Sequence, residues 1–299
     1  TTMLLATRAP VLMVPAMDGG MWEHPTVRSN VAALRARGIT VMEPEVGPLA
    51  SGLSGPGRFP EIEAIVEAIY GLLTPVKDLA ADRLLITSGP TREPLDPGRY
   101  LSNRSSGKMG HALALAALRR GAQVVVVSGP TSFPPPPGTT YVPIQTAEEM
   151  REAVLQHLSD ATIVVKAAAV ADYRPKSPSL TKISSKQERL AIELAPNPDI
   201  LQEISIRRGG TFLVGFAAET HDVSSRARAK LRSKGIDLLV VNDVSQAGIG
   251  FESDHNQVAL LDRWGGMIEL PRKTKLEVAH AIYDRVLSLR VHHPERVPR

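Results

Sequence analysis

The chain has 299 residues, 43% of them hydrophobic, and a formal net charge of +4, which describes a globular protein long enough for two domains. Its basic residues are spread out and only 4% of residues are aromatic, so neither a nucleic-acid partner nor a membrane partner is indicated. It contains no cysteine, which excludes a disulfide framework, a thiolate metal site and a cysteine nucleophile, and is compatible with a cytoplasmic location.

Residues 1–74 are expected to be the C-terminal part of a domain that starts before Thr1, because their elements are too few for an α/β core. Two loops stand out there, 15–22 and the glycine-rich stretch 47–58. Each is either a connection or a ligand-approaching loop, and the second suits a mobile flap. The elements expected are the end of a helix at 1–6, strands at 10–14 and 39–42, and helices at 25–37 and 61–73.

Residues 75–83 are predicted to be a polar linker, and residues 84–299 a second domain in which strands and helices alternate. This alternation predicts an α/β fold with a doubly wound, mainly parallel, Rossmann-like sheet. The expected strands are 84–86, 124–127, 141–144, 161–169, 190–194, 212–216 and 236–241. The expected helices are 107–120, 147–158, 199–206, 224–234 and 273–289, with a hairpin over 257–270 that turns at Gly265-Gly266.

The loop between the first strand of this domain and its helix carries unusual residues, from Pro90 to Ser106. Such a loop lies at the carboxyl edge of a parallel sheet, where ligands bind. Ser105, Ser106, Gly107 and the first helical N–H groups are a candidate anion cradle; the alternative is an ordinary helix cap after a long solvated loop. Met109 replaces the hydroxyl of a P-loop, and G-x-G-x-x-G is absent, which disfavours a nucleotide-dependent oxidoreductase.

Six stretches of the second domain, taken together, resemble a known family. Residues 84–275 resemble the phosphopantothenate–cysteine ligase domain of the bacterial bifunctional coenzyme A biosynthesis proteins. Residues 9–60 resemble the end of the family's flavodoxin-like, flavin-dependent decarboxylase domain. The stretches in the ligase part are Thr87-Ser-Gly-Pro-Thr-Arg-Glu-Pro-Leu-Asp-Pro, Ser102-Asn-Arg-Ser-Ser-Gly-Lys-Met-Gly, Ala167-Ala-Ala-Val-Ala-Asp-Tyr-Arg-Pro, Asn197-Pro-Asp-Ile, Val214-Gly-Phe-Ala-Ala-Glu-Thr and Val241-Asn-Asp.

The resemblance implies a two-step ligation that uses CTP and Mg²⁺. The carboxylate of 4′-phosphopantothenate would attack the α-phosphorus of CTP, and the amine of L-cysteine would then displace CMP from the acyl-cytidylate. The resemblance also implies a homodimer, with the hairpin at 257–270 as a candidate contact, larger assemblies for a complete decarboxylase domain, and FMN in the full-length protein. The alternative, a non-catalytic nucleotide- or flavin-binding assembly subunit, predicts loss of Asn103, Asp172 or Lys182, all of which are present.

Roles for individual residues also come from the resemblance. Asn103 would hold the acyl-cytidylate or the substrate carboxyl, and Lys182 would be the catalytic lysine. Each residue also has an ordinary explanation as a turn, cap, core or solvated position, and no metal ligands are assigned. The remaining residues implied in nucleotide binding are Lys166, Ala167, Ala168, Asp172, Asn197, Pro198, Asp199, Ile200, Phe216, Lys230 and Lys234.

The sequence departs from the family pattern at three places. Ser184-Ser185 follow Lys182-Ile183 where the family often has two lysines. Asp18 stands where the family's Pro-Ala-Met-Asn motif has asparagine, and Ser51 stands where many members have a catalytic cysteine. A serine hydroxyl is much less acidic than a thiol, and the resemblance places the family's catalytic histidine and most of its flavin site before Thr1. We therefore expect this chain neither to decarboxylate nor to bind flavin stably.

Overall fold

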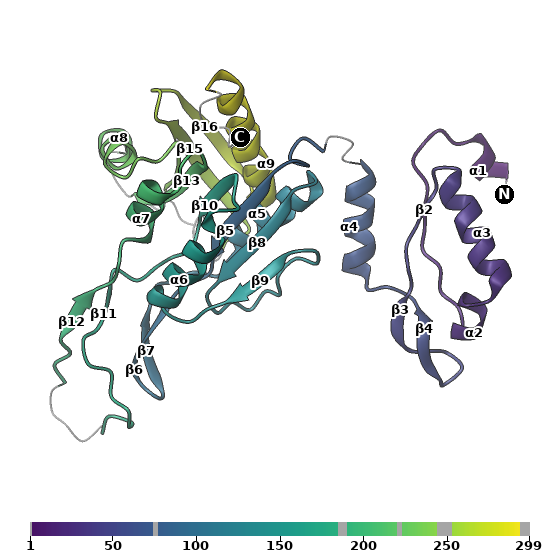
Figure 1. The fold of residues 1–299 in the computed structure, drawn as a ribbon, viewed down its shortest axis with the longest axis horizontal. Coiled ribbons are helices and arrows are strands. Elements are labelled where there is room, and N and C mark those ends of the chain that lie inside the picture. Colours follow the sequence, from purple (N-terminus) through teal and green to yellow (C-terminus); the bar gives the residue numbers. More distant parts are fainter. Residues whose placement is uncertain (1, 74–76, 185–189, 220–222, 244–252, 294–299) are drawn as a thin grey trace. The chain divides into compact units, whose positions relative to one another are not determined.

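A computed structural model describes residues 2–73, 77–184, 190–219, 223–243 and 253–293. It divides into two units, Thr1–Lys77 and Asp78–Arg299, each with its own hydrophobic core (Figure 1). Residues 78–82, expected within a linker, belong to the second unit, where the Leu79 side chain is fully buried. None of the helices among the described residues is long and apolar enough to cross a membrane.

The first unit has a small core of Trp22, Val31 and Val41. The helices and strands expected from the sequence are present, with shorter strands, but the two expected loops contain further structure. The elements are α1 (Thr2–Ala6), β1 (Leu12–Met13), α2 (Gly19–Trp22), α3 (Pro25–Ala36), β2 (Thr40–Val41), β3 (Glu45–Pro48), β4 (Ser54–Arg58) and α4 (Ile62–Leu73).

The glycine-rich stretch is a β-hairpin, β3–β4, and was wrongly expected to be a loop. Gly57 has φ +127°, and a Cβ on it would lie 2.0 Å from the Met17 carbonyl oxygen. The Met17 N–H also donates to the Gly57 carbonyl at 2.9 Å. Glycine is therefore required because this hairpin presses against the main chain of the loop that precedes α2.

The second unit is built on one eight-stranded sheet in the order β16-β15-β14-β13-β10-β5-β8-β9 (Figure 1). The six strands from β14 to β9 are parallel, and β15 and β16 add an antiparallel hairpin. This confirms the predicted doubly wound, mainly parallel α/β fold. The elements are β5 (Arg83–Ser88), β6 (Arg92–Asp96), β7 (Arg99–Ser102), α5 (Lys108–Arg119), β8 (Gln123–Ser128), β9 (Thr140–Pro143), α6 (Ala147–Leu158), β10 (Ile163–Lys166), β11 (Tyr173–Pro175), β12 (Leu194–Pro196), α7 (Ile200–Arg207), β13 (Phe212–Glu219), α8 (Val223–Ser233), β14 (Leu238–Asp243), β15 (His255–Asp262), β16 (Met267–Thr274) and α9 (Lys275–His292).

Both faces of the sheet are covered, as the continuous apolar strands predict. On β5, Leu84 and Ile86 pack on one face with α5 and α9, and Leu85 packs on the other with α6, α7 and α8. Successive residues of a strand point to opposite faces, so each strand supplies both cores. The Tyr283 hydroxyl of α9 donates to the Leu113 carbonyl of α5 at 2.9 Å, which joins the two helices of the first face.

The structure corrects three expectations in this unit. The polar loop after β5 contains the hairpin β6–β7, and β10 ends at Lys166 rather than at Ala169. The strand expected at 190–194 is displaced, because β12 starts only at Leu194 and pairs with β11, an element that was not expected. Leu190 and Ile192 are 47% and 38% exposed, so their alternation with Leu194 does not reflect a buried face.

Candidate active site

The carboxyl ends of β5 and β10 form the point at which the sheet reverses its winding. From β5 the chain proceeds to β8 and β9 on one side, then crosses to β10 on the other side of β5 and continues to β13 and β14. The loops after β5 and β10 therefore leave the same edge toward opposite faces. In open α/β sheets, this is where ligands bind.

These two loops are joined by hydrogen bonds beyond the end of the sheet. The Ala169 N–H donates to the Gly89 carbonyl at 2.9 Å, and the Thr91 N–H donates to the Ala169 carbonyl at 3.2 Å. The buried hydroxyls of Thr87 and Thr91 accept from the N–H groups of Ala168 and Ala171, at 3.2 and 3.0 Å. The backbone of 167–171 is thereby fixed in place before any ligand arrives.

Helix α5 begins against the end of β5, where the anion cradle was expected. Gly107 precedes it with φ +77° and offers no side-chain cap. A Cβ on Gly110 would lie 2.2 Å from the Ser88 Oγ, so the first turn of the helix needs glycine to reach the strand. The Lys108 ammonium forms an ion pair of 2.5 Å with Asp254. The proposed cradle of Ser105, Ser106 and Gly107 thus lies at the switch point, and its binding of an anion stays a prediction.

Asn103 connects the two sides of this edge. Its Nδ2 donates to the Val170 carbonyl at 3.0 Å, so it bridges the loop after β5 and the loop after β10. The side chain is exposed. A side-chain amide has two N–H donors and one oxygen acceptor, so Asn103 keeps groups with which to bind a ligand.

A turn before α7 is attached to the same edge. Asn197 donates through Nδ2 to the Ala171 carbonyl at 2.9 Å and through its N–H to the Asp172 carbonyl at 2.8 Å. Arg174 holds the Asn197 Oδ1 at 2.9 Å. Asp199 caps α7 by accepting from the Gln202 N–H at 3.0 Å. The structure therefore brings Asn103, Asp172, Asn197 and Asp199 to one edge.

Three lysines belong to this edge. Lys166 ends β10, while Lys230 and Lys234 come from the last turn of α8 and the residue after it. The Lys234 ammonium binds the Asp199 carboxylate at 2.5 Å. Partial burial opposes ionisation of Asp199, but the hydrogen bonds from Lys234 and from the Gln202 N–H outweigh it and lower the pKa of Asp199. Burial, followed by the charge of Lys230, lowers the pKa of Lys166 to about 8.

Lys182 lies on a segment that is anchored to β6 rather than to the sheet edge. The buried Asp96 carboxylate accepts from the Ile183 N–H at 3.1 Å and from the Gly98 N–H at 2.8 Å, and Ser179 donates to the Leu95 carbonyl at 2.9 Å. Among the described residues, the ammonium of Lys182 has no hydrogen bond or ion pair, and it is exposed. The structure does not join it to Asn103 by a contact, so its catalytic role stays a prediction.

Sequence reasoning missed Asp96 and the side chain of Lys166 as parts of this region. Asp96 lies inside a recognised motif, but only the structure shows that it holds the backbone beside Lys182.

Phe216 is partly buried against the core that α5 and α9 cover, so its structural role is visible, and its contact with a base stays a prediction. Ala167 packs against the same core, and Pro198 and Ile200 belong to the Asn197 turn and the start of α7.

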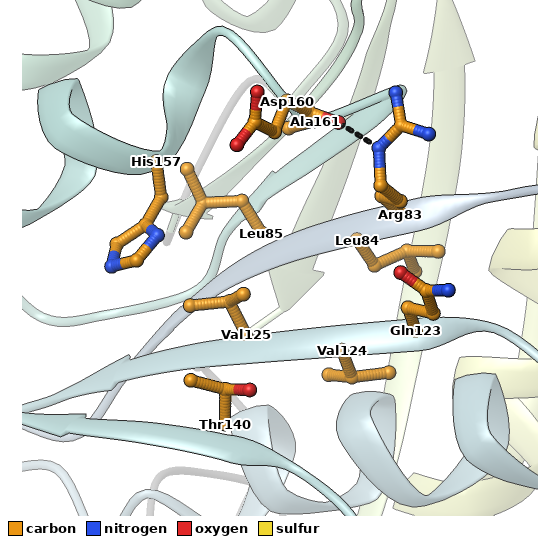
Figure 2. Close-up of a pocket in the computed structure, with 10 residues that line it drawn as sticks. All are labelled: Arg83, Leu84, Leu85, Gln123, Val124, Val125, Thr140, His157, Asp160 and Ala161. Atoms are coloured by element: carbon orange, nitrogen blue, oxygen red, sulfur yellow. Dashed lines mark hydrogen bonds between the residues drawn. The ribbon is translucent and has the colours of Figure 1, made fainter.

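A hollow of about 190 Å³ lies at the opposite, amino end of the sheet (Figure 2). Leu84, Leu85, Val124 and Val125 form much of its wall, and His157 of α6 borders it. The Arg83 Nε donates to the Asp160 carbonyl at this end. The lining combines one arginine, Arg83, with aliphatic side chains, whereas the carboxyl edge holds three lysines, so the carboxyl edge is the better candidate site for a phosphate chain.

The first unit has a hollow of its own, of about 320 Å³, between the loop before α2 and the β3–β4 hairpin. The Ser51 hydroxyl donates to the Asp18 carboxylate at 2.6 Å across it. This hydrogen bond, followed by one from the Gly20 N–H, lowers the pKa of Asp18. The two residues that depart from the family pattern therefore contact each other directly.

Comparison with known proteins identifies relatives over nearly the whole chain. The family model described as DNA/pantothenate metabolism flavoprotein C-terminal domain matches residues 79–289, and the Flavoprotein model matches residues 1–74. The chain is 42% identical to the coenzyme A biosynthesis bifunctional protein CoaBC of Bacillus subtilis over 99% of this chain and 74% of that protein. It is 43% identical to CoaBC of Mycolicibacterium smegmatis over 96% of this chain and 73% of that protein.

Solved structures resemble more than two thirds of the chain. The C-terminal domain of a CoaBC protein aligns with a TM-score of 0.60 and 42% identity, covering 70% of this chain and 96% of that one. A mutant of Cab2 in complex with phosphopantothenate-cysteine aligns with a TM-score of 0.56 over 77% of this chain and 93% of that one. At 17% identity, the second likeness shows the fold alone.

Proposed function

The chain belongs to the family of coenzyme A biosynthesis bifunctional proteins CoaBC, and from this premise we propose that residues 78–299 ligate 4′-phosphopantothenate to L-cysteine at the expense of CTP. We place the site at the carboxyl edge of β5 and β10 because of the groups that gather there. There, Asn103 and the Asn197 turn are bonded to one rigid segment, beside Lys166, Lys230 and Lys234. A polyanionic substrate requires such an excess of donors and cations.

The first step activates a poor electrophile. A carboxylate oxygen of phosphopantothenate attacks the α-phosphorus of CTP, a new P–O bond forms, and pyrophosphate leaves. In the second step the cysteine amine attacks the acyl carbon of the mixed anhydride, loses a proton and displaces CMP, which leaves an amide. Groups that hold the phosphate and acyl oxygens through both steps lower the barriers, because charge develops on those oxygens.

The roles follow from the chemistry of each side chain. Asn103 donates to the acyl oxygen without adding charge, in the position that its bond to Val170 fixes. Lys182 supplies a cation to the phosphates in the transition state. Lys230 and Lys234 bind the triphosphate, and Asp172 binds the sugar or the base. The Ala168 N–H already donates to the Thr87 hydroxyl, so we propose that the carbonyl groups of 166–168 make the backbone contacts with the base.

We propose that Mg²⁺ binds to the site together with the nucleotide. Among the described residues, no three acidic or histidine side chains form a group that could hold a metal ion. This agrees with the ordinary behaviour of Mg²⁺ in nucleotide enzymes, where phosphate oxygens and waters supply most ligands and the protein supplies one or two carboxylates.

Flavin chemistry is not proposed for the described part of the first unit. Its hollow is bordered by the Asp18 carboxylate and by Arg58, whose guanidinium is paired with Glu61. A hollow whose charged lining is one carboxylate and one arginine that is already paired does not suit the dianionic phosphate of FMN. We propose that FMN binds to a protein of the relatives' full length rather than to this unit alone.

Pyrophosphate release tests the ligase proposal. The protein is mixed with Mg²⁺, 4′-phosphopantothenate and either CTP or ATP, and the amide is then sought after addition of L-cysteine. We expect release that requires phosphopantothenate, prefers CTP and falls at least 100-fold in Lys182→Ala, as for the loss of a transition-state charge.

Lys176→Ala is the matched control, because Lys176 is an exposed lysine of the same segment that is paired with Glu193 at 2.6 Å. It should leave the rate unchanged. Absence of release with either nucleotide, from protein with a cooperative unfolding transition, would refute the proposal and favour a non-catalytic subunit. Equal losses in Lys182→Ala and Lys176→Ala would remove Lys182 from the mechanism.

A further inference from the structure

The β11–β12 hairpin projects from the body of the second unit and is held together by a short ladder (Figure 1). The ladder pairs residues 173–175 with residues 194–196, and it contains Pro175 on one strand and Pro196 on the other. Proline has no N–H group, so each proline removes a donor from this ladder. The base of the hairpin therefore depends on hydrogen bonds that side chains supply.

Arg174 supplies two of these bonds. Its Nη1 donates to the Pro196 carbonyl and to the Asn197 Oδ1, each at 2.9 Å. The arginine side chain is half-buried, and hydrogen bonds from a charged donor are stronger than those between neutral groups. A single nitrogen atom thus holds the last residue of β12 and the amide of the residue that follows it.

Asn197 connects Arg174 to the loop after β10. Its Nδ2 donates to the Ala171 carbonyl at 2.9 Å, and its N–H donates to the Asp172 carbonyl at 2.8 Å. A guanidinium offers only donors, so it selects the orientation of the amide in which Oδ1 faces Arg174 and Nδ2 faces Ala171. The reversed amide would place two donors and two acceptors against each other. Arg174 therefore determines how Asn197 holds residues 171 and 172.

Asp172 has an exposed carboxylate that makes no hydrogen bond or ion pair with the described part of the chain. The main chain beside this carboxylate is fixed on both sides. The Asp172 carbonyl is held by Asn197, and the buried Ala171 donates through its N–H to the Thr91 hydroxyl at 3.0 Å. The place from which the carboxylate meets a ligand is thus set by Asn197 and, behind it, by Arg174.

We infer that Arg174 is a positioning residue for the nucleoside part of the nucleotide. It orients Asn197, and Asn197 holds Asp172 where the carboxylate accepts from hydroxyl or amino groups of the nucleoside. The inference rests on the proposed function, which assigns the sugar or the base to Asp172. Arg174 acts through these bonds without contact with the nucleotide. The triphosphate, which is proposed to bind the lysines of α8, does not depend on them.

Isothermal titration calorimetry separates these two parts of the ligand. CTP and inorganic tripolyphosphate are each titrated with Mg²⁺ into the unmodified protein and into Arg174→Met, below the onset of unfolding of each protein. Methionine fills much of the same space but has no donor. We expect the affinity for CTP to fall on the order of 10-fold, as for one weakened charge-assisted hydrogen bond, and the affinity for tripolyphosphate to stay unchanged.

Two further variants distinguish positioning from structural damage. Arg174→Lys keeps a charge and three N–H donors on one nitrogen, so it should recover most of the affinity for CTP. In an Asp172→Asn background, Arg174→Met should weaken CTP little further, because the carboxylate through which Arg174 acts is already absent. Lys176→Met is the matched control, since it removes a cation of the same hairpin that is paired with Glu193, and it should bind CTP as the unmodified protein does.

Equal losses of affinity for CTP and tripolyphosphate would overturn the inference, as would a loss for CTP that is as large in the Asp172→Asn background as without it. If Arg174→Met does not fold, Arg174→Gln, which is shorter and uncharged, takes its place in both measurements.

The ligase proposal fails separately. CTP binding that depends on Arg174, from protein that releases no pyrophosphate, would uphold the inference and refute the ligase. Pyrophosphate release by the unmodified protein, together with an unchanged affinity for CTP in Arg174→Met, would refute the inference alone. Failure of the unmodified protein to bind CTP would overturn both.

Discussion

Asp96→Asn tests whether the anchoring of the Lys182 segment matters for catalysis. The Asp96 carboxylate is inaccessible to solvent and accepts from two backbone N–H groups, those of Gly98 and Ile183. Burial opposes its ionisation, but these bonds and nearby Arg99 outweigh burial and lower the pKa of Asp96. Asparagine has the same shape but only one oxygen, so one of the two N–H groups must face an NH₂ donor.

The size of the effect follows from this mismatch. A buried donor left without an acceptor costs about 1–3 kcal/mol, and we expect a loss of about 2 kcal/mol in the free energy of unfolding. The Ser179 N–H still binds the Leu95 carbonyl, so the segment shifts rather than detaches. A displacement of the catalytic group by about 1 Å costs on the order of 100-fold in rate. We expect kcat for pyrophosphate release to fall 10- to 100-fold, with little change in KM for CTP.

A double-mutant cycle distinguishes positioning from general destabilisation. The kcat for pyrophosphate release is measured for Asp96→Asn, Lys182→Ala and the double variant, below the onset of unfolding of each protein. If Asp96 acts through Lys182, adding Asp96→Asn to Lys182→Ala lowers kcat little further. Multiplicative losses in the double variant would refute the reasoning.

Three further predictions concern stability. Gly110→Ala would place a methyl group 2.2 Å from the Ser88 Oγ, so we expect urea denaturation to show a free energy of unfolding that is lower by about 1–3 kcal/mol. Gly71→Ala is the control, because a Cβ there would have nothing within 4 Å, and it should not destabilise the protein. Asp237→Ala leaves a buried guanidinium without its carboxylate, and should lower the free energy of unfolding by about 3–5 kcal/mol; a loss below about 1 kcal/mol would contradict this view of the pair. Burial, followed by the charge of a nearby lysine, lowers the pKa of Lys275 to about 8, which is below its value in the unfolded chain. Folding therefore releases a proton in this range, and the free energy of unfolding should rise from pH 8 to about pH 10. A Lys275→Met variant that shows the same rise would refute the assignment to Lys275.

The order of elements was predictable because apolar periodicity and caps agreed. The helix expected at 147–158 is α6, whose capping box of Thr146 and Glu149 marks its start in the sequence. The β6–β7 hairpin was missed because its buried residues, Glu93 and Asp96, are polar and form hydrogen bonds. The sequence of this hairpin therefore lacks the alternation of apolar and polar residues by which strands are predicted.

The candidate site was predictable as an edge, but not as a set of contacts. The end of β5 could be inferred from Gly89-Pro90. The bond from Asn103 to Val170 joins residues 67 positions apart, and no local pattern encodes it. The same holds for Lys166, whose neighbours Asp199 and Lys230 come from two different helices.

The two threonine hydroxyls at the switch point have a consequence for what this edge can tolerate. A main-chain carbonyl can satisfy a neighbouring N–H only while two segments run at strand spacing, whereas a hydroxyl on a side chain reaches further. Thr87 and Thr91 therefore keep the N–H groups of Ala168 and Ala171 bonded beside the main-chain bonds of Gly89 and Ala169 that join the two loops. Valine has the same shape, but at either position it would leave a buried N–H group without an acceptor. The spacing between the loops is thus held by two hydroxyl oxygens as well as by main-chain bonds, and a substitution that keeps the volume would still loosen it.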